Sequence, residues 1–296
     1  MIGTASTLGN SPRRWLLCAA LLALGGCADA FFALVGSGVD ASRFERRAGI
    51  VFDTEHALAL DAYVPRHASA APMVVFFYGG SWVEGRRRWY RYVGDALASR
   101  GVIVLIPDYR KYPDVKFPDF MLDAALAVAW AREHAAQLGG DAQRLFVMGH
   151  SAGGQIAALL ACDRRYLGAV GLKPRALAGM IGVAGAYSFL PFVDDEPAIF
   201  GDDARGRYDS QPINFVDGDE PPLLLLHGED DDEVPPANAQ AMAERAQAMD
   251  GTAQLKLYAG ATHASVLLAF ARPRHTQVPA LTDTLEFIAQ QRASPP

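Results

Sequence analysis

Short apolar runs alternate with longer amphipathic segments along most of this chain. The runs at residues 72–78, 102–107 and 222–227 are almost continuously apolar, which is typical of strands buried on both faces of a sheet. Residues 58–64 instead alternate apolar and polar side chains, which predicts an edge strand paired with residues 50–52 in an antiparallel hairpin. The same patterns predict further strands at 145–148, 177–183 and 255–258, and helices at 89–99, 120–138, 155–161, 237–249 and 281–290.

Buried strands that alternate with helices predict an α/β fold, with a mostly parallel central sheet of about eight strands and helices on both faces. No domain boundary is visible after about residue 48, so residues 48–296 are expected to form one domain. Residues 185–220 lack periodicity and are rich in Asp, Pro and Gly, which favours a short cap inserted over the strand ends. The aromatic residues of this cap are expected to wall a substrate pocket: Phe189, Phe192, Phe200 and Tyr208.

The first 27 residues show the pattern of an export signal. Arg13 and Arg14 precede an apolar stretch at residues 15–24 that is too short to cross a bilayer as a mature helix. The stretch ends in Leu24-Gly25-Gly26-Cys27, which resembles the bacterial lipobox, whose cysteine is lipidated and becomes the new N-terminus. An ordinary secretory signal, cleaved after a small residue, is the alternative.

The lipobox resemblance implies a signal peptide at 1–26, lipid attachment at Cys27 and a tether at 27–47. The protein is then expected to be exported and lipid-anchored to the cell envelope, at the outer membrane if the host has one. A periplasmic or secreted protein is the alternative. Cys18 would leave with the signal, so Cys162 would be the single remaining thiol and no disulfide framework is expected within the chain.

Composition and charge narrow the classes of partner. Apolar residues make up 51% and charged residues 20% of the 296 residues, which is typical of a globular domain with a large core. The net charge is −6 and there is no basic stripe, which argues against binding to nucleic acid. The acidic segments fit no EF-hand spacing, and neither a metal nor an organic cofactor is expected.

The most informative motif is Gly149-His150-Ser151-Ala152-Gly153, which follows the apolar run at 145–148 and precedes the helix predicted at 155–161. A Gly-x-Ser-x-Gly motif between a strand and a helix is typical of a sharp turn that exposes a nucleophilic serine. Glycine is needed at both outer positions because the turn brings the backbone too close for side chains. A plain Gly/Ser turn is the alternative.

A serine hydroxyl needs a base, and the base needs a carboxylate that holds its tautomer. Three adjacent aspartates, Asp230, Asp231 and Asp232, directly follow the strand at 222–227, and the pattern alone leaves the choice among them open. A run of acidic residues is otherwise typical of a solvated loop.

The candidate base is His263, which follows both the acidic run and the strand at 255–258. His275 comes later, but in a Pro- and Arg-rich stretch. His150 occupies a variable position of the serine turn, and His227, at the end of a strand, is expected to order the acidic loop.

Backbone N–H groups that stabilise a developing oxyanion are expected at two places. One is Ala152, directly after the serine. The other is the loop Tyr78-Gly79-Gly80-Ser81-Trp82, which follows a buried strand and whose paired glycines let the backbone approach a substrate.

With these residues, the chain resembles the α/β-hydrolases of the bacterial esterase/lipase type over about residues 48–292. It is similar to carboxylesterases with a His-Gly-Gly-Gly oxyanion loop, especially the subgroup of kynurenine-formamidase-like, prenylcysteine-methylesterase-like and feruloyl-esterase-like enzymes. The resemblance is carried by residues 78–82, 107–110 and 149–154, by the acidic loop and by His263.

The resemblance implies the α/β-hydrolase fold and the acid Asp231, because related enzymes carry His-Gly-x-x-Asp-x-x-Val-Pro where this chain has residues 227–235. It also implies oxyanion donors at Gly80, Ser81 and Ala152. Two positions depart from the family, since Tyr78 replaces the usual histidine and Ser81 the third glycine. The histidine supports the loop, and a tyrosine hydroxyl is expected to provide similar support.

The expected function is hydrolysis of a small or short-chain carboxylic ester by a Ser151, Asp231 and His263 triad through an acyl-enzyme, without a cofactor. The alternatives are a small-amide hydrolase, similar to acylformamidases, and a non-catalytic surface lipoprotein. The expected partners are a small-molecule ester and, through the N-terminal lipid, a membrane.

Overall fold

The centre of the molecule is one sheet of eight strands in the order β1-β2-β4-β3-β5-β6-β7-β8. The computed structural model describes residues 32, 34–35, 42–271 and 277–292. The strands are β1 (Phe44–Asp53), β2 (Leu58–Pro65), β3 (Ala71–Phe77), β4 (Ile103–Pro107), β5 (Gly140–His150), β6 (Gly179–Val183), β7 (Leu223–Gly228) and β8 (Ala253–Tyr258).

The sheet is antiparallel at one edge and parallel elsewhere. β2 pairs antiparallel with both β1 and β4, whereas β4, β3, β5, β6, β7 and β8 run parallel to one another. The central residues of β3, β5 and β7 have almost no exposed surface, as continuous apolar runs predict for strands covered on both faces. The predicted α/β-hydrolase fold and the edge hairpin are confirmed.

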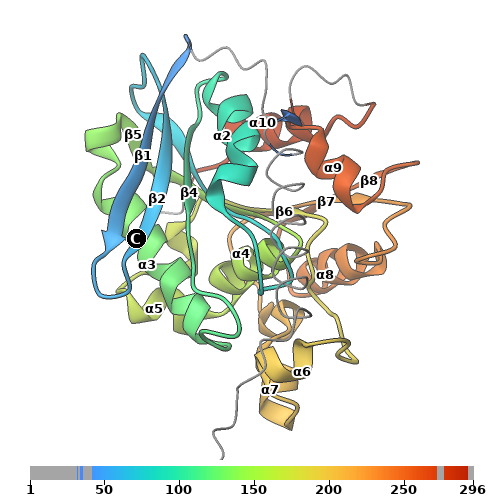
Figure 1. Cartoon of the computed structure of the whole chain (residues 1–296). Helices are drawn as coiled ribbons and strands as arrows, with labels where there is room; N and C mark the ends of the chain where they lie inside the picture. Colours follow the sequence, from blue (N-terminus) through green and yellow to red (C-terminus); the bar gives the residue numbers. More distant parts are fainter. Residues whose placement is uncertain (1–31, 33, 36–41, 272–276, 293–296) are drawn as a thin grey trace, which may run out of the picture.

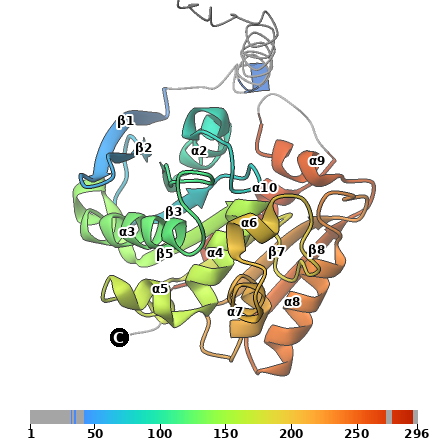
Figure 2. The same ribbon diagram turned by 60° about the horizontal axis from the view of Figure 1, so that its bottom comes forward.

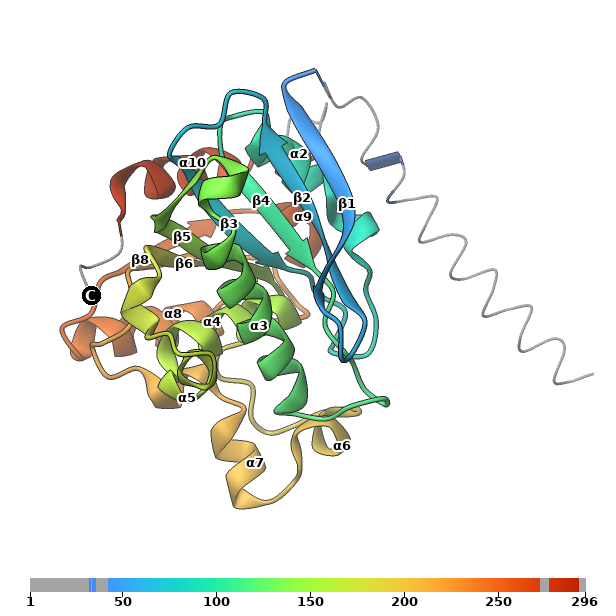
Figure 3. The ribbon, with the colours of Figure 1, turned by 90° about the vertical axis from the view of Figure 1, so that its left-hand side faces the viewer.

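Helices cover both faces of the sheet (Figures 1, 2 and 3). Figure 2 shows α2 and α10 on one side, with α3, α4, α5 and α8 on the other. The α-helices are α2 (Arg91–Ala98), α3 (Asp119–Glu133), α4 (Ala152–Cys162), α5 (Arg164–Ala169), α6 (Glu196–Phe200), α7 (Ala204–Asp209), α8 (Ala237–Ala248), α9 (His263–Leu268) and α10 (Ala280–Gln290).

Two strands are longer than the pattern predicts. β1 begins at Phe44, four residues before the expected start of the domain, and its side chains at residues 45–49 are exposed, so the apolar pattern marks only its end at residues 50–52. β5 begins at Gly140, where it pairs with Ala71 before the apolar part of the strand. The expected cap at 185–220 contains α6 and α7, two short helices that project from the body of the molecule (Figure 1).

The N-terminal predictions fall outside the part of the chain that the structure describes. This applies to the signal peptide at 1–26, to Cys27 and to most of the tether. Within the described residues, none of the helices combines the length and the apolar character required to cross a membrane. Cys162 is buried as a free thiol at the end of α4.

The parallel strands bring the candidate site together, because the carboxyl ends of such strands meet at one edge of the sheet. The serine follows β5, the acidic loop follows β7, and His263 follows β8 after a short turn. The loop at residues 78–82, hereafter the oxyanion loop, follows β3, the neighbour of β5.

Candidate active site

Ser151 lies at the sharp turn between β5 and α4, with backbone angles that L-residues rarely adopt (φ 53°, ψ −123°). The Ser151 N–H donates to the Val183 carbonyl at 3.0 Å, and the Gly154 N–H donates to the Ser151 carbonyl at 2.8 Å. The turn therefore holds this serine at the carboxyl edge of the sheet, directly before the N-terminus of α4.

The two motif glycines leave no room for a side chain. A Cβ atom on Gly149 would lie 1.9 Å from the Gly153 carbonyl oxygen, and one on Gly153 would lie 2.1 Å from the Phe77 carbonyl oxygen. We expect Gly153→Ala to lower the free energy of unfolding by about 3 kcal/mol or more, because backbone atoms must move. Gly168→Ala is the control, since nothing lies within 4 Å of that position in α5 and alanine favours helix. Equal melting temperatures of the two variants would contradict this packing argument.

His263 and Asp231 form a buried pair. His263 Nδ1 lies 2.8 Å from Asp231 Oδ2, and each residue has only 5% of its surface exposed. Asp230 and Asp232 are exposed, so the structure brings only the middle aspartate of the run to this histidine. His275, the later alternative, lies outside the described residues.

The surroundings of Asp231 favour its charged form. Burial raises its pKa, but hydrogen bonds from His227, His263 and the Val234 N–H outweigh burial and hold the pKa well below its usual range. The Glu233 and Val234 N–H groups donate to Asp231 Oδ1 at 3.1 and 2.8 Å, which fixes the carboxylate in its loop. A charged carboxylate held in this way can orient the imidazole and stabilise it when it is protonated.

His227 orders the acidic loop, as the sequence suggests. Its Nε2 lies 2.7 Å from the Val234 carbonyl and 3.1 Å from Asp231 Oδ2, and its side chain is fully buried. One N–H shared between these two oxygens ties the start of the loop to its end. His227 contacts the carboxylate of Asp231, which supports a role in positioning that carboxylate.

His263 is held in place by the start of its own helix. It is the first residue of α9, directly after Thr262. The Thr262 side chain accepts from the Ser265 N–H, and the Ser265 hydroxyl accepts from the Thr262 N–H at 2.7 Å, which forms a capping box. This cap fixes the backbone from which the imidazole extends toward Asp231.

The candidate oxyanion donors lie in the oxyanion loop and at the start of α4. Among the described residues, the N–H groups of Gly80, Ser81 and Ala152 have no backbone acceptor. The Gly80 carbonyl accepts instead from the Val83 and Glu84 N–H groups, which closes a tight turn after the loop. Gly80 has φ 126°, and a Cβ atom there would lie 2.6 Å from the Glu84 carbonyl oxygen, so glycine is required at this position.

The support of the oxyanion loop differs from the expectation for Tyr78. Its hydroxyl donates to Asp108 Oδ1 at 3.2 Å and accepts from Lys111 Nζ at 3.2 Å. Both partners lie outside the loop, so this hydroxyl does not bond to the loop itself. The loop is held by two other tyrosines: Tyr109 donates to the Tyr78 carbonyl at 2.8 Å, and Tyr90 to the Gly79 carbonyl at 3.4 Å. Both rings stack on the Tyr78 ring. Residues 107–110 contribute to the family resemblance, but no sequence pattern indicated that Tyr109 or Tyr90 holds this loop.

Trp82, at the end of the oxyanion loop, is joined to α4 and to the cap. Its Nε1 donates to Gln155 Oε1 at 3.1 Å, and Gln155 Nε2 donates to the Ser210 carbonyl at 2.9 Å. Gln155 is fully buried on α4, one turn after Ser151. The Gln155 side chain therefore connects the oxyanion loop, α4 and the cap.

Three of the four predicted cap aromatics pack beside Trp82. The Phe189 ring stacks on the indole at 5.6 Å, Phe200 meets it edge-on at 4.8 Å, and Phe192 stacks on Phe200 at 5.7 Å. Tyr208 does not join them, because it is 53% exposed and packs on Phe215 on the outer side of the cap. The prediction that Tyr208 helps to wall a substrate pocket was therefore wrong.

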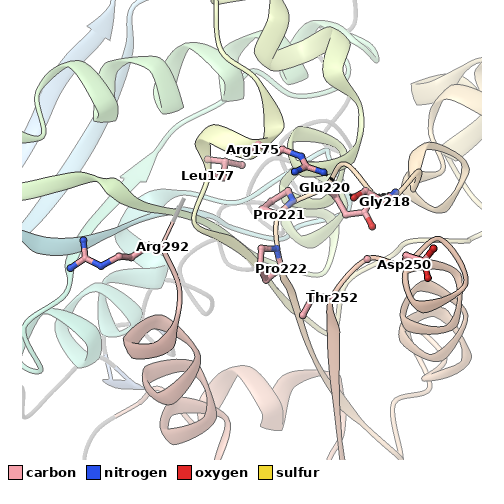
Figure 4. A pocket seen from close by; sticks show the side chains of 10 residues that line it. Arg175, Leu177, Gly218, Glu220, Pro221, Pro222, Asp250, Thr252 and Arg292 are labelled. Atoms are coloured by element: carbon pink, nitrogen blue, oxygen red, sulfur yellow. Dashed lines mark hydrogen bonds between the residues drawn. The ribbon is translucent and has the colours of Figure 1, made fainter. Parts of the chain in front are cut away.

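Two cavities lie away from the serine. The pocket in Figure 4 has a volume of about 180 Å³ and is lined by residues that precede β6, β7 and β8, such as Leu177, Pro222 and Thr252. It therefore opens at the edge of the sheet opposite to Ser151. The second, of about 530 Å³, lies between α3, α5 and the cap and is bordered by Phe200. Among the described residues, no group of three or more His, Cys, Asp or Glu side chains is arranged so that it could hold a metal ion.

The sequence is similar to those of named esterases. The family described as BD-FAE matches residues 60–168. A probable isoprenylcysteine alpha-carbonyl methylesterase from Arabidopsis thaliana is 29% identical over 251 residues, which cover 75% of this chain and 52% of that protein. Esterase LipC from Mycobacterium tuberculosis is 30% identical over 234 residues, which cover 70% of this chain and 56% of that protein. The chain thus spans about half the length of the curated relatives it matches.

Solved structures share the fold over most of its length. A thermophilic esterase from Thermogutta terrifontis is 26% identical with a TM-score of 0.66, and the match covers 85% of this chain and 92% of that one. A truncated carbohydrate esterase from gut microbiota has a TM-score of 0.73 at 20% identity, covers 86% of this chain and 99% of that one, and shows the fold alone. The chain therefore has the α/β-hydrolase fold, and it is similar in sequence and in fold to proteins named as esterases.

Proposed function

We propose that the protein is a serine esterase that hydrolyses small or short-chain carboxylic esters through Ser151, His263 and Asp231. The observation that carries the proposal is the 2.8 Å contact between His263 and the buried Asp231, at the same sheet edge as the strained serine turn. The N–H groups without an acceptor in the oxyanion loop and at the start of α4 support it, because acyl transfer needs such donors.

In the first half-reaction, His263 takes the proton of Ser151 Oγ as this oxygen attacks the ester carbonyl carbon. The carbonyl oxygen becomes an oxyanion, and the N–H groups of Gly80 and Ala152 stabilise it, each by about 3 kcal/mol. The bond to the alcohol oxygen then breaks, and the alcohol leaves with the proton from His263.

In the second half-reaction, His263 takes a proton from water as the water oxygen attacks the acyl-enzyme carbon. The bond between the acyl carbon and Ser151 Oγ breaks, the serine recovers its proton, and the carboxylic acid leaves. Asp231 remains charged throughout, which its depressed pKa favours.

The hydrogen bonds that anchor the cap support a specificity for esters with a small acyl group. Trp82 and Phe200 form a packed aromatic wall beside the oxyanion loop. The Phe189 N–H donates to Gln211 Oε1 at 2.7 Å, and Gln155 holds Ser210, so the wall is fixed by hydrogen bonds within the cap and from α4. We therefore expect this wall to limit the length of the acyl chain that fits.

The test is hydrolysis of p-nitrophenyl acetate, butyrate, octanoate and palmitate by the purified protein. We expect the highest kcat/KM with acetate or butyrate and a value lower by about tenfold or more with palmitate, because the added methylenes do not fit the walled site. Equal or faster turnover of palmitate would contradict the short-chain specificity. Faster cleavage of the matched p-nitroanilides would show an amide hydrolase and overturn the ester assignment.

A further inference from the structure

His150 lies between the oxyanion loop and His263. Only 7% of its surface is exposed. Its ring is packed against the oxyanion loop, since a Cβ atom on Gly79 would lie 3.0 Å from His150 Nδ1. On another side, the ring centroid is 4.8 Å from that of His263, with an angle of 50° between the planes. The side chain therefore contacts both the oxyanion loop and the base.

The His150 ring is uncharged at neutral pH. Burial lowers its pKa to about 3, and the neighbouring His263 acts in the same direction. The titratable groups that act on it are His263 from α9, with Asp231 and His227 from β7 and the acidic loop. On the side of the oxyanion loop the ring faces Gly79, which has no titratable side chain.

Folded-state stability does not explain a histidine at this position. Among the described residues, neither ring nitrogen of His150 makes a hydrogen bond of good geometry, although a polar contact with the backbone of His263 partly opposes the lowering of its pKa. A buried polar group without a partner destabilises the folded state, and an apolar side chain of similar volume would avoid this penalty. The ring therefore has a property that the site uses at some loss of stability.

We propose that His150 is a positioning residue for His263, an inference that rests on the proposed hydrolase function. Its neutral ring keeps the imidazole of His263 in place between the oxyanion loop and Asp231. When His263 takes the proton of Ser151 it becomes a cation, and an uncharged aromatic ring whose centroid is 4.8 Å away stabilises that cation. Because the cation forms during the reaction, this contact favours the transition state over bound substrate.

The test compares His150→Leu, which removes the ring, with His150→Phe, which keeps an aromatic ring without nitrogen atoms. For His150→Leu we expect kcat on p-nitrophenyl butyrate to fall about tenfold with KM within about twofold of its original value. The acidic limb of the kcat/KM profile should move to lower pH, since protonated His263 loses a favourable contact. The melting temperature should stay equal or rise, because the unpaired ring nitrogens are gone.

His150→Phe is expected to recover most of kcat and the original acidic limb. His134→Leu is the matched control, because His134 also stacks on an aromatic ring, at 4.0 Å from Trp130, but lies at the end of α3. It should leave kcat and the pH profile unchanged. An equal loss of kcat in His150→Leu and His150→Phe with unchanged acidic limbs would show a packing role and overturn the proposal, as would unchanged kcat in both.

The rate at which a fluorophosphonate probe labels Ser151 separates this proposal from the proposed function. This reaction also needs His263 to take the serine proton, but it needs no natural substrate. If the protein is labelled but cleaves none of the esters, the ester assignment fails and the His150 variants are ranked by labelling rate, with His150→Leu expected to be the slowest. Equal labelling of the protein and both variants would overturn the role of His150 alone. A folded protein that is not labelled would overturn both proposals.

Discussion

Ser151→Ala is expected to lower kcat for ester hydrolysis by about 10⁶-fold and to abolish labelling by a fluorophosphonate probe. The reason is that no other group can form the acyl-enzyme, so only the residual effect of the oxyanion donors and of binding remains. Alanine keeps the Cβ atom, so the turn with φ 53° carries the same backbone strain as before. The measurement is kcat on p-nitrophenyl butyrate, together with the melting temperature.

Ser188→Ala is the control for this variant, because Ser188 is an exposed serine of the cap whose hydrogen bond to Asn238 uses only its backbone N–H. It should keep the original kcat. A Ser151→Ala protein that retains more than about 1% of the activity would place the nucleophile elsewhere and refute the assignment.

Asp231→Asn is expected to lower kcat by about 10³ to 10⁴-fold, because an amide cannot hold His263 in the tautomer that accepts the serine proton. Asp230→Asn and Asp232→Asn are matched controls, since they make the same chemical change one position away on exposed side chains. Both should keep kcat within about twofold. A larger loss in either control than in Asp231→Asn would show that the acid had been assigned to the wrong residue.

Asp231→Asn is also expected to change how the stability of the folded protein depends on pH. The pKa of Asp231 is lower in the folded protein than in the unfolded chain, so the stabilisation is present above the unfolded pKa of about 4 and is lost as pH falls below it. Asp231→Asn removes this contribution, so its melting temperature should decrease less between pH 5 and pH 3 than that of the original protein. Parallel curves for the two proteins would contradict the depressed pKa.

The sequence pattern was sufficient for the parallel strands because burial on both faces leaves a continuous apolar run, as in β3 and β7. It was insufficient for the first part of β1, residues 44–49, whose side chains are mostly exposed and which is held by backbone pairing to β2. Pairing of this kind leaves no mark on residue type. The short helices α5, α6 and α7 were missed for a similar reason, since five or six residues are too few to show a helical period.

Within the candidate site, the sequence indicated the order of the groups but not their contacts. Three identical carboxylates in a row differ only in burial, and burial depends on how the loop from β7 returns through His227 and Val234. The tyrosines that hold the oxyanion loop come from separate segments, with Tyr90 and Tyr109 lying 11 and 31 residues from their acceptors. Partners at such separations become neighbours only through the fold.

The hydrogen bonds of Gln155 have a consequence for how the site is assembled. They join α4 to Trp82, which lies 73 residues earlier in the chain, and to Ser210 of the cap, which lies 55 residues later. Both partners are needed to satisfy one buried amide, so the loss of either hydrogen bond leaves a buried polar group that destabilises the contact with the other partner. We therefore expect the position of Trp82 and the docking of the cap to be coupled. A chain nicked within residues 185–220 would lose the geometry around Trp82 even with Ser151, Asp231 and His263 intact, so catalytic competence would report on the integrity of a segment that supplies no catalytic group.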